Sequence, residues 1–405
     1  MQNSDDKIIG YSVAIYTVLL FLVFVFFGYT PYPDSEGYIY CAQESLSHNQ
    51  FYPFREGLYE LPFLWNIGAI NAVAASLWLF GSVTPLLIVY TLMKGFSLLL
   101  TYKIALTCFG KRAAYIACVL YMLYPANYGE GTSLHSEVPF VFFILSAIWS
   151  SLKGRYVLSG LLFGCADYIR PFALIFIMAV MLQDLRNYKA HLRMLAVYAA
   201  FIMSIGLSNY CSKGEFVYKA KTGWMALAQY HWDHDSEKTT PDPQCVTENE
   251  RLTYTQKDEL WREMFISWLK DNKAEYVRQI PVKVVNTYVS DNIGMCTFLS
   301  QEEKQSEYMY RSLSMHTLIK DFPHYSAVQW LTVVNLLFYY AVMTVFVLSI
   351  KYIKELRLQW LVLILGTLFI AFVGHGESRF HIPFMPFVIM AASYYISKMG
   401  MMRGE

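Results

Sequence analysis

The 405-residue chain has few charged residues, since Lys, Arg, Asp and Glu make up 16% of it, against about 25% in an ordinary soluble domain. Neither sign dominates, because 32 Lys and Arg meet 31 Asp and Glu and leave a formal net charge of +1. No basic excess is present to attract phosphate backbones, so the sequence gives no reason to expect a nucleic-acid partner.

Cysteine and nucleotide-binding motifs are equally sparse. The seven cysteines are spread over the chain without a Cys-x-x-Cys pair or a zinc-binding spacing. Cys245 and Cys296 share one polar segment and could form a disulfide, although free buried cysteine is common. We find no P-loop, no Rossmann glycine motif and no internal repeat. Together with the low charge, these absences exclude a disordered protein, a secreted disulfide scaffold and an ordinary cytosolic enzyme.

Apolar and aromatic residues dominate, at 56% and 17% of the chain. A helix needs about 20 mostly apolar residues to cross the hydrocarbon core. Ten candidate stretches lie at 8–29, 85–108, 113–128, 137–151, 156–169, 171–184, 194–211, 327–350, 358–374 and 381–397. We therefore predict an all-α polytopic membrane protein with about ten transmembrane helices and a mixed, mainly helical outer-side insert.

Three apolar regions could each be interpreted in two ways. The first could be a signal peptide, but no small-x-small cleavage site follows it, so we expect it to be retained. The stretches 156–169 and 171–184 could form one long helix, but Pro171 favours a tight hairpin. The segment 61–80 is interrupted by Asn66, Gly68 and Asn71, and we expect it to lie at the membrane interface.

Charge predicts the orientation. With a cytoplasmic N-terminus, thirteen basic residues fall inside and three fall in the short outside loops. The inside set is Lys7, Lys111, Arg112, Lys153, Arg155, Arg186, Lys189, Arg193, Lys351, Lys354, Arg357, Lys398 and Arg403; the outside set is Arg55, Arg170 and Arg379. We therefore expect a multi-pass plasma (inner) membrane protein with both termini cytoplasmic and its active site on the extracytoplasmic side.

This topology divides the chain into three parts. Residues 1–211 form an N-terminal transmembrane module whose first outer loop is 30–84, residues 212–325 form an extracytoplasmic loop domain, and residues 326–405 form a C-terminal transmembrane module. Within the loop domain, Leu260 to Leu269 predict an amphipathic helix that either packs on the rest of that domain or contacts the membrane surface. A second helical stretch begins near Lys273, and Pro281 is expected to end or kink it.

Ionisable residues gather at the predicted outer ends of the helices. The four outside loops carry Asp34, Glu36, Tyr38, Arg55 and Glu56; Glu130, His135 and Glu137; Asp167 and Arg170; and His375, Glu377, Arg379 and His381. Polar loops collect charges for topological reasons alone, and that accounts for some of these residues. It accounts poorly for segments as compact as Asp-Tyr-Ile-Arg-Pro and Gly-Glu-Ser-Arg-Phe-His-Ile-Pro, which sit where a span turns.

The residue types at this face favour one chemistry. A carboxylate can deprotonate a hydroxyl nucleophile, an arginine can bind phosphate oxygens, and an apolar groove can hold a lipid tail. Glycosyl transfer from a lipid-linked sugar phosphate to an acceptor hydroxyl needs all three. Asp233 and Asp235 form an Asp-x-Asp pattern that could bind a divalent metal, but no α/β domain surrounds it, and a solvated turn explains it better. The sequence therefore implies no cofactor firmly, although a divalent metal is possible.

The chain resembles the GT-C superfamily of membrane glycosyltransferases, specifically bacterial family 39, which is related to protein O-mannosyltransferases and to the lipid A aminoarabinose transferase. The matching segments run in family order over nearly the whole chain. They are Asp34 to Tyr38, Tyr59 to Phe63, Phe80-Gly81, Leu123 to Pro125, Ser136 to Phe140, Gly160 with Ile169 to Pro171, and Glu377 to Pro383.

The resemblance implies a polyprenyl-phosphate-linked sugar as donor and a glycan, lipid or protein acceptor, in contact with membrane lipids. It implies Asp34 as general base, assisted by Glu36 or Glu137, and Arg170, Arg379 and Lys94 as ligands of the donor phosphate. We expect substrate contacts from Tyr38, Arg55, His135, Glu377 and His381. Asp34 could instead cap the helix that begins near Glu36.

Two other functions fit the same topology. An O-antigen polymerase or ligase also uses outside arginines, but it normally lacks an acid directly after the first span. A transporter should show paired halves and charges in the middle of its helices, and Lys94 is the clear mid-span charge here. A non-catalytic relative that acts as a scaffold would tolerate the loss of Asp34.

Overall fold

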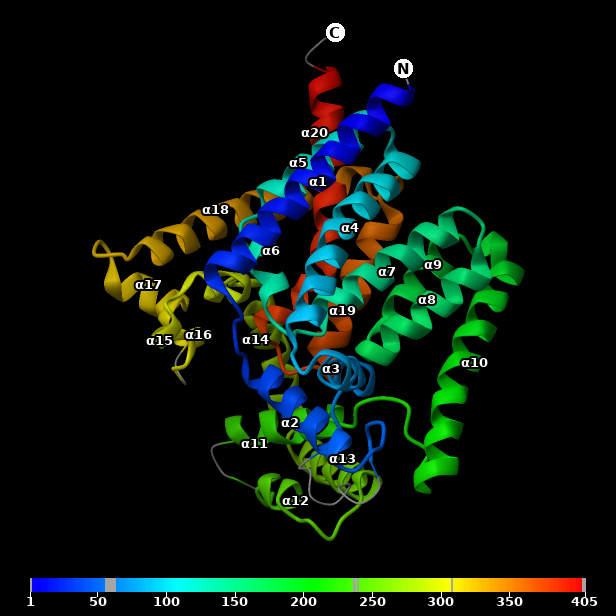
Figure 1. Cartoon of the computed structure of the whole chain (residues 1–405), viewed down its shortest axis with the longest axis vertical. Helices are drawn as coiled ribbons and strands as arrows, with labels where there is room; N and C mark the ends of the chain where they lie inside the picture. Colours follow the sequence, from blue (N-terminus) through cyan, green and yellow to red (C-terminus); the bar gives the residue numbers. More distant parts are fainter. Residues whose placement is uncertain (1, 55–62, 236–237, 239, 307–308, 403–405) are drawn as a thin grey trace.

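The computed structural model describes residues 2–54, 63–235, 238, 240–306 and 309–402 (Figure 1). In these ranges all regular structure is helical and no strand is present, which confirms the predicted all-α class. The two ends of the chain lie on the same side of the molecule, at the free ends of α1 and α20 (Figure 1).

Five helices in the described residues are long and apolar enough to cross a membrane. They belong to α1 (Gln2–Phe27), α4 (Thr84–Phe109), α10 (Tyr188–Lys213), α18 (Ala327–Leu348) and α20 (Met385–Met402). A sixth candidate joins α6 (Ala126–Gly129) and η1 (Glu130–Thr132) to α7 (Glu137–Leu152) across a bend of 111°. These helices have the length and composition of membrane spans, as the sequence predicts.

The other apolar helices are shorter. They are α3 (Ile67–Phe80), α5 (Lys111–Leu123), α8 (Tyr156–Ile169), α9 (Ala173–Gln183) and α19 (Arg357–Val373). At 1.5 Å per residue, the 14 residues of α8 reach about 21 Å, less than the roughly 30 Å of a hydrocarbon core. Each of the ten apolar stretches coincides with a helix, but the number of spans and their orientation stay predictions.

The break between α8 and α9 lies where the sequence places it. Arg170 ends α8 with an extended backbone, φ −154° and ψ 124°, because Pro171 disfavours the helical conformation of the residue before it. The two helices then pack against each other, so the single long helix is excluded and a hairpin is formed (Figure 1). This turn carries Arg170.

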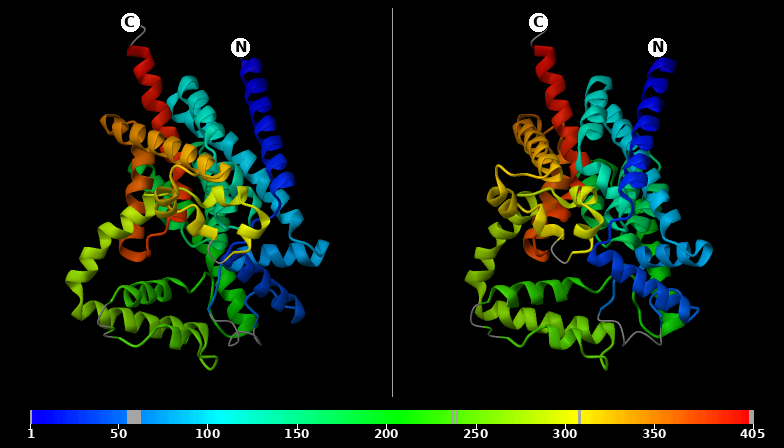
Figure 2. Two further views of the ribbon diagram at one scale, coloured as in Figure 1. Left: turned by 90° about the vertical axis from the view of Figure 1, so that its left-hand side faces the viewer. Right: turned by 60° about the vertical axis from the view of Figure 1, so that its left-hand side comes forward.

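The predicted loop domain is helical. Its described elements are α11 (Gly223–His234), α12 (Gln244–Thr247), α13 (Tyr254–Asp271), α14 (Lys273–Tyr288), η3 (Ile293–Phe298), α15 (Gln301–Lys304), α16 (Met309–Ser312) and α17 (Met315–Asp321). The short η2 (Leu185–Asn187) lies before α10, outside this domain. The helices α11 and α13 form a layer apart from the apolar helices, and α14 leads from it toward α18 and α19 (Figure 2).

The amphipathic helix is confirmed as α13, which begins at a capping box between Thr253 and Gln256. Trp261, Phe265 and Trp268 are buried against α11, so its apolar face packs within the loop domain. The second helix continues through Pro281 to Tyr288, so Pro281 does not end it, and the alternative that Pro281 kinks it stays a prediction. All seven cysteines are free, which also excludes the disulfide between Cys245 and Cys296.

The described start of the predicted first outer loop forms α2 (Pro33–Ser47), which packs on α3. Proline at the first helical position and acids in the first turn suit a helix N-terminus. The backbone of α3 approaches that of α8 so closely that a Cβ on Gly68 would lie 2.7 Å from the Tyr168 carbonyl oxygen. This contact fixes α2 and α3 beside the turn that carries Arg170.

The C-terminal module begins with α18 and η4 (Ser349–Tyr352), continues through α19, and reaches α20 after η5 (Ser378–Phe384). The last helix is the most enclosed, since 89% of its apolar window is buried. It packs on α5 and α18, and η5 lies between α14, α19 and α7. The segment that carries Arg379 is therefore held by helices from both ends of the chain.

Candidate functional site

Asp34 and Arg379 form an ion pair although 345 residues separate them in the sequence. Arg379 donates from Nη1 to the Asp34 carboxylate. The Asp34 side chain is 20% exposed and that of Arg379 is 19% exposed, so both remain accessible to a ligand. Asp34 is the second residue of α2, and Tyr32 occupies the N-cap position without a side-chain cap. The alternative that Asp34 caps the helix is therefore wrong.

Glu377 and His375 extend this pair. The Arg379 Nε lies 2.7 Å from a Glu377 carboxylate oxygen, and the His375 Nε2 lies 2.8 Å from the other. Burial by itself would raise the pKa of Glu377, but Arg379 and His375 outweigh it and hold that pKa below its usual range. Gly376, between them, has φ +75° and rests on the Lys283 backbone, so it must lack a side chain.

Glu137 and Arg170 form a second ion pair, which is more deeply buried than the first. Their side chains are 3% and 7% exposed, and the Arg170 Nη1 lies 2.9 Å from the Glu137 Oε1. Arg170 also donates to the Ser136 hydroxyl at 3.0 Å, and its guanidinium lies over the rings of Phe172 and Phe380. This arginine is already neutralised and enclosed, so it can position neighbours but offers little surface to a ligand.

The two pairs belong to one cluster, which we call the arginine–carboxylate site: Asp34, Glu137, Arg170, Glu377 and Arg379. Arg379 lies within electrostatic reach of Glu137 as well as of Asp34 and Glu377, and Arg170 lies within reach of Glu377. The site joins the start of α2, the start of α7, the α8–α9 turn and the segment before α20.

Aromatic residues close one side of the site. The Tyr32 ring lies 4.0 Å from the His135 ring and 5.4 Å from the Tyr310 ring. Tyr38, also predicted to contact substrate, is buried; its hydroxyl accepts a hydrogen bond from Asn66 at 2.9 Å, and burial raises its pKa to about 12. Tyr38 therefore lines the site as an uncharged, buried side chain.

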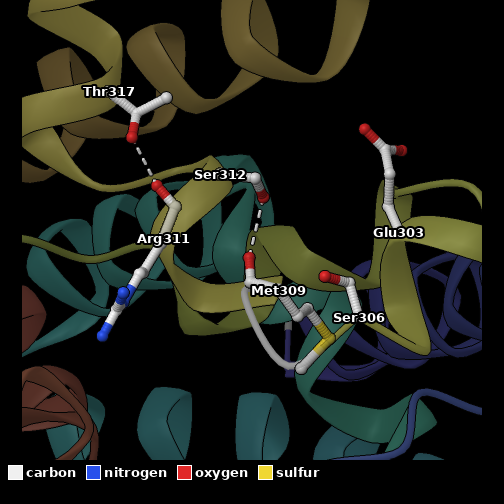
Figure 3. Close-up of a pocket in the computed structure, with 6 residues that line it drawn as sticks. All are labelled: Glu303, Ser306, Met309, Arg311, Ser312 and Thr317. Atoms are coloured by element: carbon white, nitrogen blue, oxygen red, sulfur yellow. Dashed lines mark hydrogen bonds between the residues drawn. The ribbon is translucent and has the colours of Figure 1, made fainter.

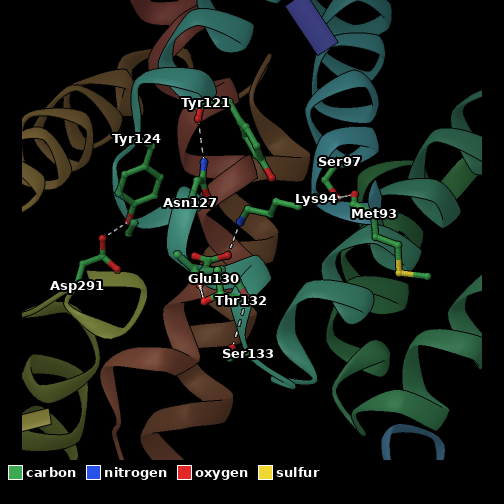
Figure 4. Close-up of polar contacts among 12 residues, drawn as sticks. Met93, Lys94, Ser97, Tyr121, Tyr124, Asn127, Glu130, Thr132, Ser133 and Asp291 are labelled. Carbon is green, nitrogen blue, oxygen red and sulfur yellow. Dashed lines mark hydrogen bonds and ion pairs between the residues drawn. The ribbon is translucent and has the colours of Figure 1, made fainter. Parts of the chain in front are cut away.

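Four predicted residues are not assigned to this site. Glu36 is exposed on α2 and is not among the contacts of either pair. Arg55 lies outside the described residues. Lys94 is buried among helices and forms an ion pair with Glu130 beside the Tyr121 ring, and its contact with a phosphate stays a prediction (Figure 4). Its charge is neutralised before any ligand arrives.

His381 is the fourth, and it is buried in a polar network instead of facing a substrate. Its Nδ1 donates to the Thr287 carbonyl at 2.9 Å, and its Nε2 lies 3.2 Å from Asp291 Oδ1. The other Asp291 oxygen accepts from Tyr124 at 2.5 Å (Figure 4). The same oxygen accepts from Asn335 at 3.0 Å. The network ties the end of α5, α18 and η5 to the end of the loop domain, so His381 has a structural role.

The weak metal candidate gains no further ligands. Asp233 accepts a hydrogen bond from Gln229 at 2.9 Å, and Asp235 accepts one from the Trp268 indole at 3.2 Å. Over the part of the chain that the structure describes, no three His, Cys, Asp or Glu side chains are placed to hold one ion. Both carboxylates already have a protein partner, and a metal at these two residues stays a hypothesis.

A pocket of about 260 Å³ lies in the segment from α15 to α17 (Figure 3). Its lining consists of Glu303, Ser306, Met309, Arg311, Ser312 and Thr317. Tyr310, next to this lining in the chain, contacts Tyr32 and lies within electrostatic reach of Arg379 and Asp34. Sequence reasoning missed Tyr310, because no motif or periodicity in 300–317 points to it.

Comparison of the chain with protein-family models, with curated proteins and with solved structures found no match. The function is therefore argued from the chemistry of the arginine–carboxylate site.

Proposed function

We propose that the protein is an inverting glycosyltransferase that moves a sugar from a polyprenyl-phosphate donor to an acceptor hydroxyl. The observation that carries this proposal is the pairing of Asp34 with Arg379 at an accessible point beside apolar helices. Such a reaction needs a base on one side of the anomeric carbon and a phosphate ligand on the other, because the acceptor attacks opposite the bond to the phosphate.

In the proposed reaction, the acceptor oxygen bonds to the anomeric carbon while the bond from that carbon to the phosphate oxygen breaks. The bonding electrons leave with the phosphate, and Arg379 stabilises the charge that develops there. Asp34 takes the proton of the acceptor hydroxyl. Arg379 uses Nη1 for Asp34 and faces Glu377 with Nε, and a guanidinium has five N–H groups, so others remain for a phosphate.

Glu137 and Arg170 are assigned a positioning role. Because they are nearly enclosed, they set the electrostatic surroundings of Arg379 and hold Ser136 and the α8–α9 turn in place. Of the two arginines predicted to bind the donor phosphate, we therefore assign the contact to Arg379 and not to Arg170. The predicted ten spans, cytoplasmic termini and outward-facing site belong to the same proposal, since a lipid-linked donor on the outer side needs no ATP there.

The test compares the surface glycans and glycolipids of cells that carry the wild-type protein, the Asp34→Asn variant or no protein. We expect one sugar modification to be lost both without the protein and with Asp34→Asn at equal expression. Native mass spectrometry of the purified protein should also detect a retained polyprenyl phosphate. Identical glycan profiles in all three cell lines would refute the proposal.

A transporter is the second candidate, and one observation favours it. The Lys94–Glu130 pair lies buried between α4 and η1. Burial of charged groups within membrane helices costs free energy, and such groups usually mark a functional site. A Glu130→Gln variant that keeps glycan transfer would give this pair a structural role, whereas loss of solute uptake without loss of a glycan would favour transport.

A further inference from the structure

The loop-domain helix α14 has two chemically different faces. Gln279, Lys283 and Thr287 are buried on one of them. The opposite face exposes an apolar stripe, with Val277 at 62%, Val282 at 46%, Val285 at 57% and Val289, just past the helix end, at 40%. Pro281 lies on the same exposed face. A stripe of this kind on a water-soluble domain would leave a contiguous apolar surface in contact with water.

Two tyrosines fix the position of α14 along α19. The Tyr276 hydroxyl donates to the Phe372 carbonyl at 2.9 Å, at the C-terminal end of α19. Three turns later, the Tyr288 hydroxyl bonds to the Thr367 hydroxyl at 2.7 Å. Thr367 lies six residues before Val373, about 9 Å along the helix. The second half of α14 therefore runs beside α19, toward the middle of that helix.

The end of α14 also meets α18. Tyr339 donates to the Tyr288 carbonyl at 3.0 Å, and Tyr340 donates to the Val289 carbonyl. These tyrosines lie near the middle of the 22-residue α18, a helix long and apolar enough to cross a membrane. The middle of a spanning helix lies inside the hydrocarbon core. The residues that bond to it must then lie at a similar depth.

Charge along α14 changes in the same direction. Lys273, Glu275 and Arg278 all lie in its first six residues, and the Arg278 side chain is 83% exposed, where it can reach lipid phosphates. Beyond them the one charged residue, Lys283, faces inward, with its ammonium over the Tyr230 ring. The helix is charged at its start, whereas its exposed face at the end carries valines and the uncharged Asn286.

The neighbouring surface continues the stripe. Leu337, 65% exposed, lies one turn from Tyr340 on the same face of α18, and Leu368, 48% exposed, follows Thr367 on α19. We propose that α14 is embedded in the lipid bilayer from about Gln279 to Val289 and that its valine stripe contacts lipid acyl chains. This part of the predicted outer domain then belongs to the membrane region.

Fluorescence quenching tests the proposal in the full-length protein, reconstituted in phosphatidylcholine nanodiscs. A bimane label is attached to Val285→Cys, in a background where the exposed Cys211 and Cys245 are replaced by serine. The matched control is Glu263→Cys on the exposed face of α13. The unsubstituted background, labelled in parallel, gives the signal to subtract.

We expect doxyl groups on the lipid chains to quench the label at position 285 several-fold more than the label at 263, and aqueous iodide to do the reverse. Equal quenching of both labels by iodide would overturn the proposal, because position 285 would then lie in water. Quenching of position 285 by neither agent would also overturn it, since a second protein chain would then cover the stripe. Both outcomes are independent of any enzymatic activity.

Discussion

Arg379 holds Asp34 from the opposite end of the chain, so the first turn of α2 is tied to the segment that begins the last helix. The contact places an acid and a cation at one accessible point. Because both side chains are about one-fifth exposed, a phosphate could reach Arg379 without unfolding of the surrounding helices.

Replacing Asp34 with Asn tests the base. The amide oxygen can still accept the hydrogen bond from Arg379, but it cannot take a proton at neutral pH. A positioned base contributes about 10²–10⁴-fold, so we expect sugar transfer to fall at least about 100-fold with normal expression. The matched control is Glu36→Gln, two residues away and exposed, which we expect to keep near-normal transfer. Near-normal transfer by Asp34→Asn would contradict the assignment.

Replacing Arg379 with Lys tests the phosphate contact. Lysine keeps the charge but cannot bind two oxygens with a planar fork, and one charge-assisted hydrogen bond is worth about 1.5 kcal/mol. We expect the affinity for a polyprenyl phosphate, titrated by native mass spectrometry, to fall about tenfold. Arg262→Lys on the exposed face of α13 should leave it unchanged. An unchanged affinity in Arg379→Lys and in Arg379→Ala would remove Arg379 from the donor site.

Replacing Arg170 should lower the stability of the folded protein. Its removal leaves Glu137 buried without its cation, which typically costs about 3–5 kcal/mol. We expect Arg170→Ala to lower the thermal unfolding temperature clearly, measured by intrinsic fluorescence in detergent. The double variant Arg170→Met with Glu137→Gln should recover much of the loss, because no unpaired charge remains. An Arg170→Ala protein as stable as the wild type would show that the pair is not enclosed.

The topology is tested with reporter fusions. The charge count predicts that fusions after Lys153 and Lys354 report the cytoplasm, and that a fusion after Glu250, in an exposed turn of the loop domain, reports the other side. Alkaline phosphatase activity and a green fluorescent reporter give complementary signals at each position. An extracytoplasmic signal at Lys153 would contradict the prediction that the arginine–carboxylate site lies on the extracytoplasmic face.

The loop domain should weaken in mild acid through His231. Its ring is buried against Trp268, and burial, followed by the charge of Lys283, lowers its pKa to about 3. Between that pKa and the unfolded value near 6.5, the unfolded state binds more protons at His231 than the folded state does. The contribution of His231 to the free energy of unfolding is therefore full above pH 6.5 and is lost as the pH falls. At pH 5.5 the loss is about 1 kcal/mol.

The variant His231→Phe keeps an aromatic ring on Trp268 but does not titrate. We expect its unfolding temperature to fall less than that of the wild type between pH 7.5 and pH 5.5. The exposed His316→Phe serves as the matched control and should follow the wild type. Equal slopes in His231→Phe and the wild type would show that His231 is not held neutral.

The sequence by itself determined the helical class, the apolar helices and the break at Pro171. These features depend on local causes: the apolar content of about 20 successive residues, and the steric restriction that proline places on the residue before it. It also indicated that Asp34, Glu137, Arg170 and Arg379 share one face, because positive charge along the loops constrains which helix ends meet.

Only the tertiary structure decided the pairing within that face. Arg170 and Arg379 are the same residue type in similar sequence surroundings, yet one is enclosed with Glu137 and the other remains accessible beside Asp34. Lys94 and His381 found buried partners, Glu130 and Asp291, that lie 36 and 90 residues away. Sequence patterns carry periodicity and local preference, but which charge meets which depends on how helices pack, and packing is set by contacts between distant residues.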